Sequence, residues 1–209
     1  MNPSTSPAAA AQCTTKPRTQ YIFIDYENVC ESDLSRVIGK PVRVFMILGS
    51  SQNKLPTSLF LFLQDHPEQL RIIPTPVKGR NALDFVLILE LGRWLTADPE
   101  GYFHIISKDT DFDSVIRHLK SEKRLIARHS SLTEIPALLT PDERVAKLKA
   151  ELADASKSRP STRKTLENKI KSAFENKAKP EFIEKAINTF VQSGLLDFTD
   201  TNKVLYKIA

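Results

Sequence analysis

The sequence has few cysteines, few glycines and no long apolar run. Its two cysteines, Cys13 and Cys30, have neither the spacing of metal ligands nor an obvious disulfide partner, which is typical of a reducing compartment. No stretch approaches the roughly 18 consecutive apolar residues of a spanning helix, and the N-terminus lacks the basic start and apolar core of a signal peptide. We therefore expect a cytoplasmic protein without a membrane partner.

The chain also lacks the glycine-rich loops that bind phosphate in nucleotide-dependent enzymes. With six glycines it contains neither GxxxxGK nor GxGxxG, and no Ser-His-Asp order stands out. These absences disfavour NTP hydrolysis and dinucleotide chemistry. None of the four histidines has the spacing of a helical metal site: His66, His104, His118 and His129. We expect His104, which lies inside a predicted strand, to pack in the core.

Charge is present but unevenly distributed. The 209 residues are 41% hydrophobic and 26% charged, as in globular proteins, and the net charge is +5. Residues 157–209 contain 11 Lys or Arg and 6 Asp or Glu, so this segment alone carries +5. A basic segment attached to a neutral domain is typical of proteins with a polyanionic partner such as nucleic acid, although a solvated surface gives the same pattern.

The order of predicted elements indicates an α/β fold. Residues 1–18 are rich in Pro, Ser, Thr and Ala and are expected to form a disordered leader, and residues 19–140 are expected to form one domain. The predicted strands of this domain cover residues 21–25, 42–48, 70–77, 102–107 and 123–128, and the predicted helices cover residues 31–37, 55–65, 82–95 and 112–121. This alternation predicts a Rossmann-like, five-stranded parallel sheet between helices.

The C-terminal part has a different pattern. Residues 141–162 are expected to form a helix, with Pro141 in its first turn, followed by a polar linker. Residues 163–209 contain two amphipathic stripes and then two short strands around a polar turn, an order that resembles a winged-helix module. Such a module can bind RNA, dock a protein partner or form a homodimer. Its lysines favour contacts with a phosphate backbone, with Arg163 and Lys164 as candidates.

Acidic residues gather where predicted strands end. "YIFIDYENV" places Asp25 directly after an apolar run, and "HIISKDTDFDSVIRHL" places Asp109, Asp111 and Asp113 between a strand and a helix. One Asp can cap that helix and another gains from its dipole, but three acids in five residues exceed this need. Since ligands of parallel α/β sheets bind at the carboxyl ends of the strands, both groups lie at the expected site.

A further acid lies in "KGRNALDFVLILELGRW". Asp84 shares a helical face with apolar residues, which places its carboxylate at the edge of the core. The alternative is a capping box in which Asn81 is the N-cap and Asp84 lies three residues later. Lys78 and Arg80, in the loop before this helix, are expected to meet a phosphate backbone or to be solvated.

Convergence of these acids would require a cation. Two carboxylates about 4 Å apart repel each other by about 4 kcal/mol at an effective dielectric constant near 20. Oxygen ligands without a nearby His or Cys favour Mg²⁺ or Mn²⁺ over zinc. A divalent ion held by carboxylates suits in-line attack on a phosphodiester, because it activates water and stabilises charge that develops on the phosphate.

Three motifs in this order resemble the PIN-like nucleases, in particular their NYN-type branch, over about residues 20–140. "FIDYENV" is similar to the family's D-x-x-N after strand one, "KGRNALDFVLILELG" to the helix with its second Asp, and "ISKDTDFD" to its S/T-x-D-x-D-F after strand four. The resemblance implies a metal-dependent ribonuclease that holds one or two Mg²⁺ or Mn²⁺ ions and leaves a 3′-hydroxyl.

The resemblance also implies roles for individual residues. Asp25 would be the central metal ligand, Asp84 and Asp109 further ligands, and Asn28 would orient the first loop or a substrate phosphate. Asp111 matches the later Asp of the strand-four motif, and Asp113 is an extra acid that would replace it or bind through water. The fourth ligand therefore stays open, and so do the roles of the nearby Glu27 and Glu31. The candidate RNA contacts are Lys78, Arg80, Lys108, Arg163 and Lys164.

Other interpretations compete with the nuclease. "DYENV" is close to the D-x-D-x-T/V of haloacid-dehalogenase phosphatases, but Glu27 replaces the second Asp and no cap-like insertion follows. A second alternative is a PIN-like domain that has lost turnover and binds RNA or a protein. A regulatory receiver-type domain is a third. The complete set of acids favours the nuclease over the domain without turnover.

Overall fold

The computed structural model describes residues 17–52, 54–75, 78–174 and 178–207, so most of the expected leader, residues 1–16, lies outside the described residues. The chain divides into two compact units, Met1–Glu134 and Ile135–Ala209. None of the helices in the described ranges is both long and apolar enough to cross a membrane.

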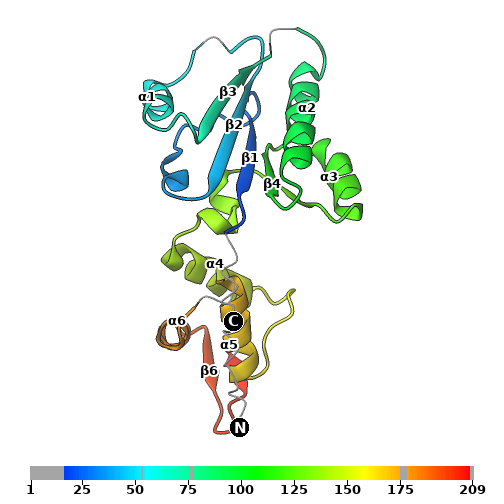
Figure 1. Ribbon diagram of the computed structural model, residues 1–209. Coiled ribbons are helices and arrows are strands. Elements are labelled where there is room, and N and C mark those ends of the chain that lie inside the picture. The colour runs from blue at the N-terminus through cyan, green and yellow to red at the C-terminus, as the bar shows by residue number, and fades with distance from the viewer. Residues whose placement is uncertain (1–16, 53, 76–77, 175–177, 208–209) are drawn as a thin grey trace, which may run out of the picture. The chain divides into compact units, whose positions relative to one another are not determined.

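The N-terminal unit is built on one parallel sheet (Figure 1). Its strands are β1 (Gln20–Asp25), β2 (Val42–Leu48), β3 (Leu70–Pro74), β4 (Tyr102–Ile106) and β5 (Leu125–His129). They are ordered β3-β2-β1-β4-β5, with every neighbouring pair parallel. This confirms the predicted α/β fold with a five-stranded parallel sheet. The register aligns Asp25 with Ile47 and Ile24 with Ile106, so β1, β2 and β4 end at the same edge.

Helices cover both faces of this sheet. Figure 1 shows α1 (Thr57–Asp65) on one side and α2 (Ala82–Ala97) and α3 (Phe112–Ser121) on the other. The predicted helix over residues 31–37 is wrong, because only a single 3₁₀ turn, η1 (Ser35–Val37), forms there. The Asp33 side chain accepts a hydrogen bond from the Ser35 N–H (2.9 Å), a local bond that competes with helix formation.

The core under α2 is aromatic and aliphatic. Phe23 stacks on Phe45 and Tyr21 stacks on Phe103, with ring centroids 4.9 and 5.0 Å apart, and the inward side of α2 adds Leu87. These rings fix the first strand beneath the helix that carries Asp84.

His104 is buried in the sheet, with 1% of its surface exposed, which confirms its predicted place in the core. Its ring nitrogens hydrogen-bond to His129 (3.1 Å) and Gln20 (2.9 Å). Burial, followed by the charge on His129, lowers the pKa of His104 to about 3. His104 is therefore a neutral core residue at physiological pH.

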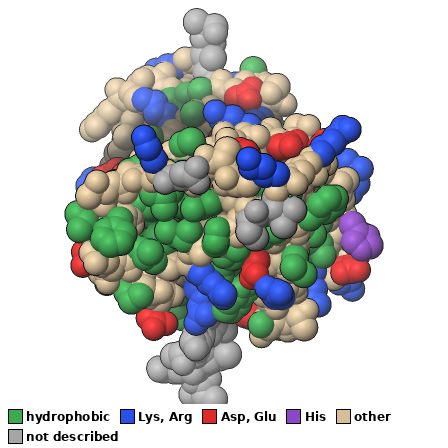
Figure 2. All heavy atoms as spheres, turned by 90° about the horizontal axis from the view of Figure 1, so that it is seen from above, with side chains coloured by type: hydrophobic (Ala, Val, Ile, Leu, Met, Phe, Trp, Pro, Cys, Tyr) green, Lys and Arg blue, Asp and Glu red, His purple; other side chains and the backbone are tan. Residues whose placement is uncertain are grey.

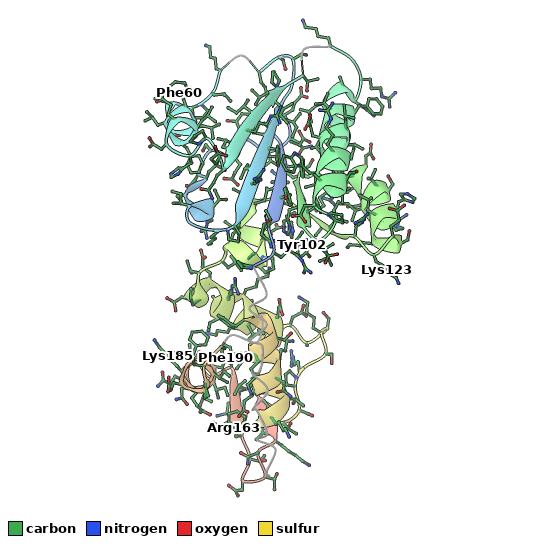
Figure 3. All side chains as sticks on the ribbon, in the orientation of Figure 1. Phe60, Tyr102, Lys123, Arg163, Lys185 and Phe190 are labelled. Atoms are coloured by element: carbon green, nitrogen blue, oxygen red, sulfur yellow. The ribbon has the colours of Figure 1, made fainter. Side chains whose placement is uncertain are left out.

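The C-terminal unit has its own core. The N-terminal unit ends with the 3₁₀ turn η2 (Leu132–Glu134). The C-terminal unit contains the 3₁₀ turn η3 (Pro136–Leu138) and then α4 (Pro141–Ala153), α5 (Arg163–Ala173), α6 (Pro180–Gln192), β6 (Leu196–Phe198) and β7 (Val204–Tyr206). The two strands are antiparallel, and an isolated bridge joins Thr162 to Lys203. Figure 3 shows Phe190 in the interior of this unit and Lys185 on its surface.

Helix α4 belongs to this core. Leu148 and Leu152 of α4 are buried against residues of α5 and α6, so the helix expected in the connecting segment 141–162 packs within the C-terminal unit. Thr140 and Glu143 close a capping box around Pro141, which occupies the first turn as predicted.

Candidate functional site

A pocket of about 250 Å³ lies at the carboxyl edge of the parallel sheet. Four acids from three parts of the chain line it: Asp25 and Glu27 after β1, Asp84 in the first turn of α2, and Asp109 after β4. Its other lining residues are Asn28, Gly49, Ser50, Thr75, Gly79, Asn81, Ala82 and Leu83. The structure therefore brings together Asp25, Asp84, Asp109 and Asn28, as the strand-end argument predicts.

Asp25 is the most enclosed of these acids, with 4% of its surface exposed. One carboxylate oxygen accepts a hydrogen bond from Ser107 Oγ (2.8 Å) and the other from the Asn28 N–H (3.1 Å). Ser107 Oγ also accepts from the Asp109 N–H (3.0 Å), so one hydroxyl ties the two acids together. Burial raises the pKa of Asp25, and the charge on Asp109 adds to this effect.

Asp84, in the first turn of α2, is close enough to the other acids of the pocket to be affected by their charges. Burial raises its pKa first, followed by the charges on Asp25, Asp109 and Asp111 and then on Glu27. The alternative capping box of Asn81 and Asp84 does not form. Asn81 adopts the left-handed conformation (φ +59°), and its side chain makes no capping hydrogen bond. Asp84 is thus one of several acids around one space.

The three acids around the start of α3 have different surroundings. Asp109 lines the pocket and accepts a hydrogen bond from the Asp111 N–H (2.8 Å). Asp111 takes the N-cap position of α3 without a capping bond from its side chain, and it reaches the pocket only through its charge on Asp84.

Asp113 differs from the expectation that it binds a metal. It does not line the pocket, and both of its oxygens pair with Arg128, at 2.7 Å (Nε) and 2.9 Å (Nη2). These bonds lower the pKa of Asp113. Since a bidentate pair occupies both carboxylate oxygens, the structure argues against Asp113 as a ligand.

Sequence reasoning left Glu27 unassigned and missed Thr75. Glu27 reaches the pocket beside Gly49, where a Cβ would lie 2.7 Å from a Glu27 carboxylate oxygen. A Cβ at position 49 would require the end of the Glu27 side chain to move, and this pairing is visible in three dimensions alone. Glu31 lies elsewhere and accepts a long hydrogen bond from the Leu132 N–H (3.5 Å). A lone Thr75 at a strand end carries no signal in the sequence.

Comparison with protein families covers this whole arrangement. A family model described as a PIN domain matches residues 19–129, more than half of the chain and every acid of the pocket. The chain belongs to the PIN domain family. Neither the curated proteins nor the solved structures gave a match. PIN domains are usually metal-dependent ribonucleases, so the family supports a nuclease-type fold.

The donor chemistry of this PIN domain fits Mg²⁺ or Mn²⁺, which PIN domains generally use. The charge on Asp25 raises the pKa of Asp84, and the charge on Asp109 raises the pKa of Asp25. In the described ranges no Lys or Arg forms an ion pair with these three acids or with Glu27. Across those same ranges, however, no three His, Cys, Asp or Glu side chains are grouped closely enough to hold a metal ion. The pocket therefore offers suitable donors without a preformed ligand set.

Three basic residues neighbour residues of the acidic pocket in the sequence of the PIN domain. Lys78 and Arg80 are exposed before α2, and Lys108 is exposed between Ser107 and Asp109. The Lys108 N–H donates to Asn28 Oδ1 (3.2 Å), so Asn28 links the loops after β1 and β4. Figure 2 looks onto the upper end of the N-terminal unit in Figure 1 and shows Lys and Arg side chains spread over this face.

Arg163, by contrast, is committed to contacts within the C-terminal unit. It pairs with Glu184 (2.6 Å) and Glu167 (3.4 Å) and lies over the Phe198 ring, 5.3 Å from its centroid. This geometry argues against the expected phosphate contact of Arg163. Lys164 is exposed and remains a candidate.

Proposed function

We propose that this PIN domain is a metal-dependent ribonuclease of the NYN type, which cleaves phosphodiester bonds within single-stranded RNA. The observation that carries the proposal is the convergence of Asp25, Asp84 and Asp109 on one pocket at the carboxyl edge of the sheet. Four acids around one space are costly unless a cation or a proton compensates them.

In this proposal Asp25, Asp84 and Asp109 hold Mg²⁺ or Mn²⁺, and Glu27 takes the place for which Asp113 was expected. The bound ion supplies activation of water and stabilisation of negative charge on the phosphate. Ser107 and Asn28 hold the Asp25 carboxylate in one orientation through their hydrogen bonds. Asp111 adds negative charge without entering the pocket.

RNA is the proposed partner. In this proposal the exposed side chains of Lys78, Arg80 and Lys108, which neighbour pocket residues in the sequence, contact the phosphates on either side of the cleaved bond. The C-terminal unit, with three helices, an antiparallel hairpin and a bridge to the segment before α5, supports a winged-helix assignment. That unit is proposed to add phosphate contacts through residues such as Lys164, and protein docking or a homodimer are its alternative uses. The scarcity of cysteine supports a cytoplasmic location.

A PIN domain that binds RNA without cleaving it is the second candidate. The lack of any closely grouped set of three potential ligands in the described ranges favours it. The filled acid positions favour the enzyme, because a site without turnover has no need to keep so many charges together. The family match leaves phosphatase and receiver-type folds without support.

The decisive experiment compares acid variants in a cleavage assay. Asp25→Asn and Asp109→Asn should each abolish Mn²⁺-dependent cleavage of a single-stranded RNA while circular dichroism shows an intact fold. Asp113→Asn is the matched control, because this acid lies outside the pocket, and it should keep most of the activity. Equal cleavage by the wild type and both pocket variants would refute the ribonuclease.

A further inference from the structure

Thr75, the residue after β3, carries a buried hydroxyl group without a partner. Only 4% of Thr75 is exposed, and its Oγ1 makes no hydrogen bond with any part of the chain that the structure describes. The backbone N–H of Thr75 does have a partner, because it donates a hydrogen bond to the Leu48 carbonyl oxygen (2.8 Å) and extends the pairing of β3 with β2. The side chain is therefore the exception in a segment that is otherwise satisfied.

A buried hydroxyl of this kind is costly. Leaving a polar group without a hydrogen bond in the interior destabilises a protein, whereas an apolar side chain of the same shape does not. Valine has the shape of threonine and is at least as favourable in a strand. The hydroxyl at position 75 thus points to a partner that comes from outside the folded chain.

The position of Thr75 in the pocket indicates the chemistry of that partner. Asp25 and Asp109 enter from the ends of β1 and β4, while Ser50 and Thr75 enter from the ends of β2 and β3, on the other side of β1 in the sheet. Glu27 also reaches this side of the pocket, beside Gly49, so Ser50 and Thr75 are neutral hydroxyl groups in a pocket that carboxylates line. A phosphate oxygen is repelled by the carboxylates and can accept a hydrogen bond from these hydroxyl groups.

We propose that Thr75 Oγ1 donates a hydrogen bond to a phosphate oxygen of the nucleic-acid strand in this pocket. The proposal rests on the proposed function for the identity of the strand, and it assigns Thr75 to substrate binding. A hydrogen bond to a charged acceptor is among the stronger ones in proteins, so its loss should be measurable.

The test measures binding and stability together in the full chain. The parent protein carries Asp25→Asn, which is expected to bind RNA without cleaving it. Thr75→Val and Thr75→Ser are each introduced into this parent, and a single-stranded RNA oligonucleotide is titrated onto all three proteins. We expect Thr75→Val to weaken binding about tenfold or more and to raise the melting temperature of the free protein. Thr75→Ser, which keeps the hydroxyl, should bind within about twofold of its parent.

A purely structural role gives a different result, because Thr75→Val would then lower the melting temperature and Thr75→Ser would not restore affinity. That result overturns the proposal. Equal binding of RNA by Thr75→Val and its parent also overturns it, and this is the result expected if an internal water is the partner of Oγ1. A DNA oligonucleotide of the same sequence separates two acceptors on the strand. Equal weakening on RNA and DNA supports the phosphate oxygen, and weakening on RNA alone overturns it in favour of the 2′-hydroxyl.

The outcomes also separate this inference from the proposed function. If the parent binds RNA and Thr75→Val binds equally well, the inference fails and the ribonuclease stands. If the parent binds neither oligonucleotide and the wild type does not cleave RNA, both fail.

Discussion

At the scale of single residues, Asp25 and Asp113 make an informative pair because their pKa values shift in opposite directions. The folded pKa of Asp25 lies above its usual value, so the stability linked to this group falls as the pH rises through that pKa. We predict that Asp25→Asn is at least as stable as the wild type at pH 7, and that any advantage disappears as the pH approaches 4.

Asp113→Asn should behave in the opposite way. Because its folded pKa is lowered by Arg128, the group stabilises the protein above its unfolded pKa and loses this effect in acid. The variant should be less stable than the wild type at pH 7 and equal to it in acid. Urea unfolding at several pH values measures both variants, and a loss of stability for Asp25→Asn at pH 7 would contradict the burial argument.

His104 gives a second pH prediction. Its folded pKa of about 3 lies below its usual value, so the folded state binds fewer protons and stability falls as the pH drops below about 6.5. The slope from one such group is about 1.4 kcal/mol per pH unit. His104→Gln should show a shallower decline between pH 6 and 4, whatever its stability at pH 7.

Denaturant unfolding of both proteins across that range measures the difference in slope. The groups facing His104 are His129, Gln20 and Tyr102. The ring centroids of Tyr102 and His104 lie 4.4 Å apart. His129 hydrogen-bonds to His104 (3.1 Å), so His129→Gln is the control. Parallel pH profiles for the wild type and His104→Gln would show that another group determines the acid sensitivity.

The sequence predicted individual site residues wherever strand order alone decides. Asp25 and Asp109 lie at the ends of neighbouring parallel strands, so their approach follows from topology. The ion pair of Asp113 could not be predicted, because its partner Arg128 lies on β5. Whether the Asp113 carboxylate binds a metal ion or this guanidinium group depends on the direction of its side chain. The same limit applies to Glu27, whose carboxylate lies beside Gly49, a neighbour that only the fold reveals.

At the scale of elements, local signals predicted helices well where capping and periodicity agree. Helix α2 begins at Ala82 as predicted, but one of its sides is open to solvent, where Phe85 and Leu89 are 71% and 55% exposed. Its almost continuous apolar run therefore does not mean that the helix is buried on every side. The segment 31–37 failed for the opposite reason, since the Asp33 side chain satisfies the backbone locally before a helix can propagate.

Helix α4 provides a test of capping. Thr140 Oγ1 accepts from the Glu143 N–H (3.2 Å) while the Glu143 carboxylate accepts from the Thr140 N–H (2.8 Å). We predict that Thr140→Ala destabilises the C-terminal unit by about 1 kcal/mol, because an N-terminal donor of the helix loses its partner. Thermal unfolding measures this change. Thr96→Ala, an exposed threonine late in α2, is the control and should change stability less.

At the scale of the whole molecule, the two units have separate hydrophobic cores, and this separation was only partly predicted. The composition indicated a second module, but the periodicity of residues 141–153 does not tell which core their apolar face joins. Leu148 and Leu152 place that face in the C-terminal unit. Most of the net charge lies in the same unit, because residues 135–209 contain 14 Lys or Arg and 10 Asp or Glu, a surplus of +4 out of the total of +5.

Separate cores predict separate unfolding. Phe190 is fully buried in the C-terminal unit. Changing it to Ala should lower the free energy of unfolding of that unit by about 3–5 kcal/mol, because the removed ring leaves a cavity. The single tryptophan, Trp94, packs against the core of the PIN domain, so its fluorescence reports on that domain alone. In Phe190→Ala, circular dichroism should show an earlier transition while the Trp94 fluorescence midpoint stays unchanged. Phe23→Ala is the matched change in the PIN domain and should shift the fluorescence transition; a common shift of both signals in Phe190→Ala would mean that the two units unfold as one.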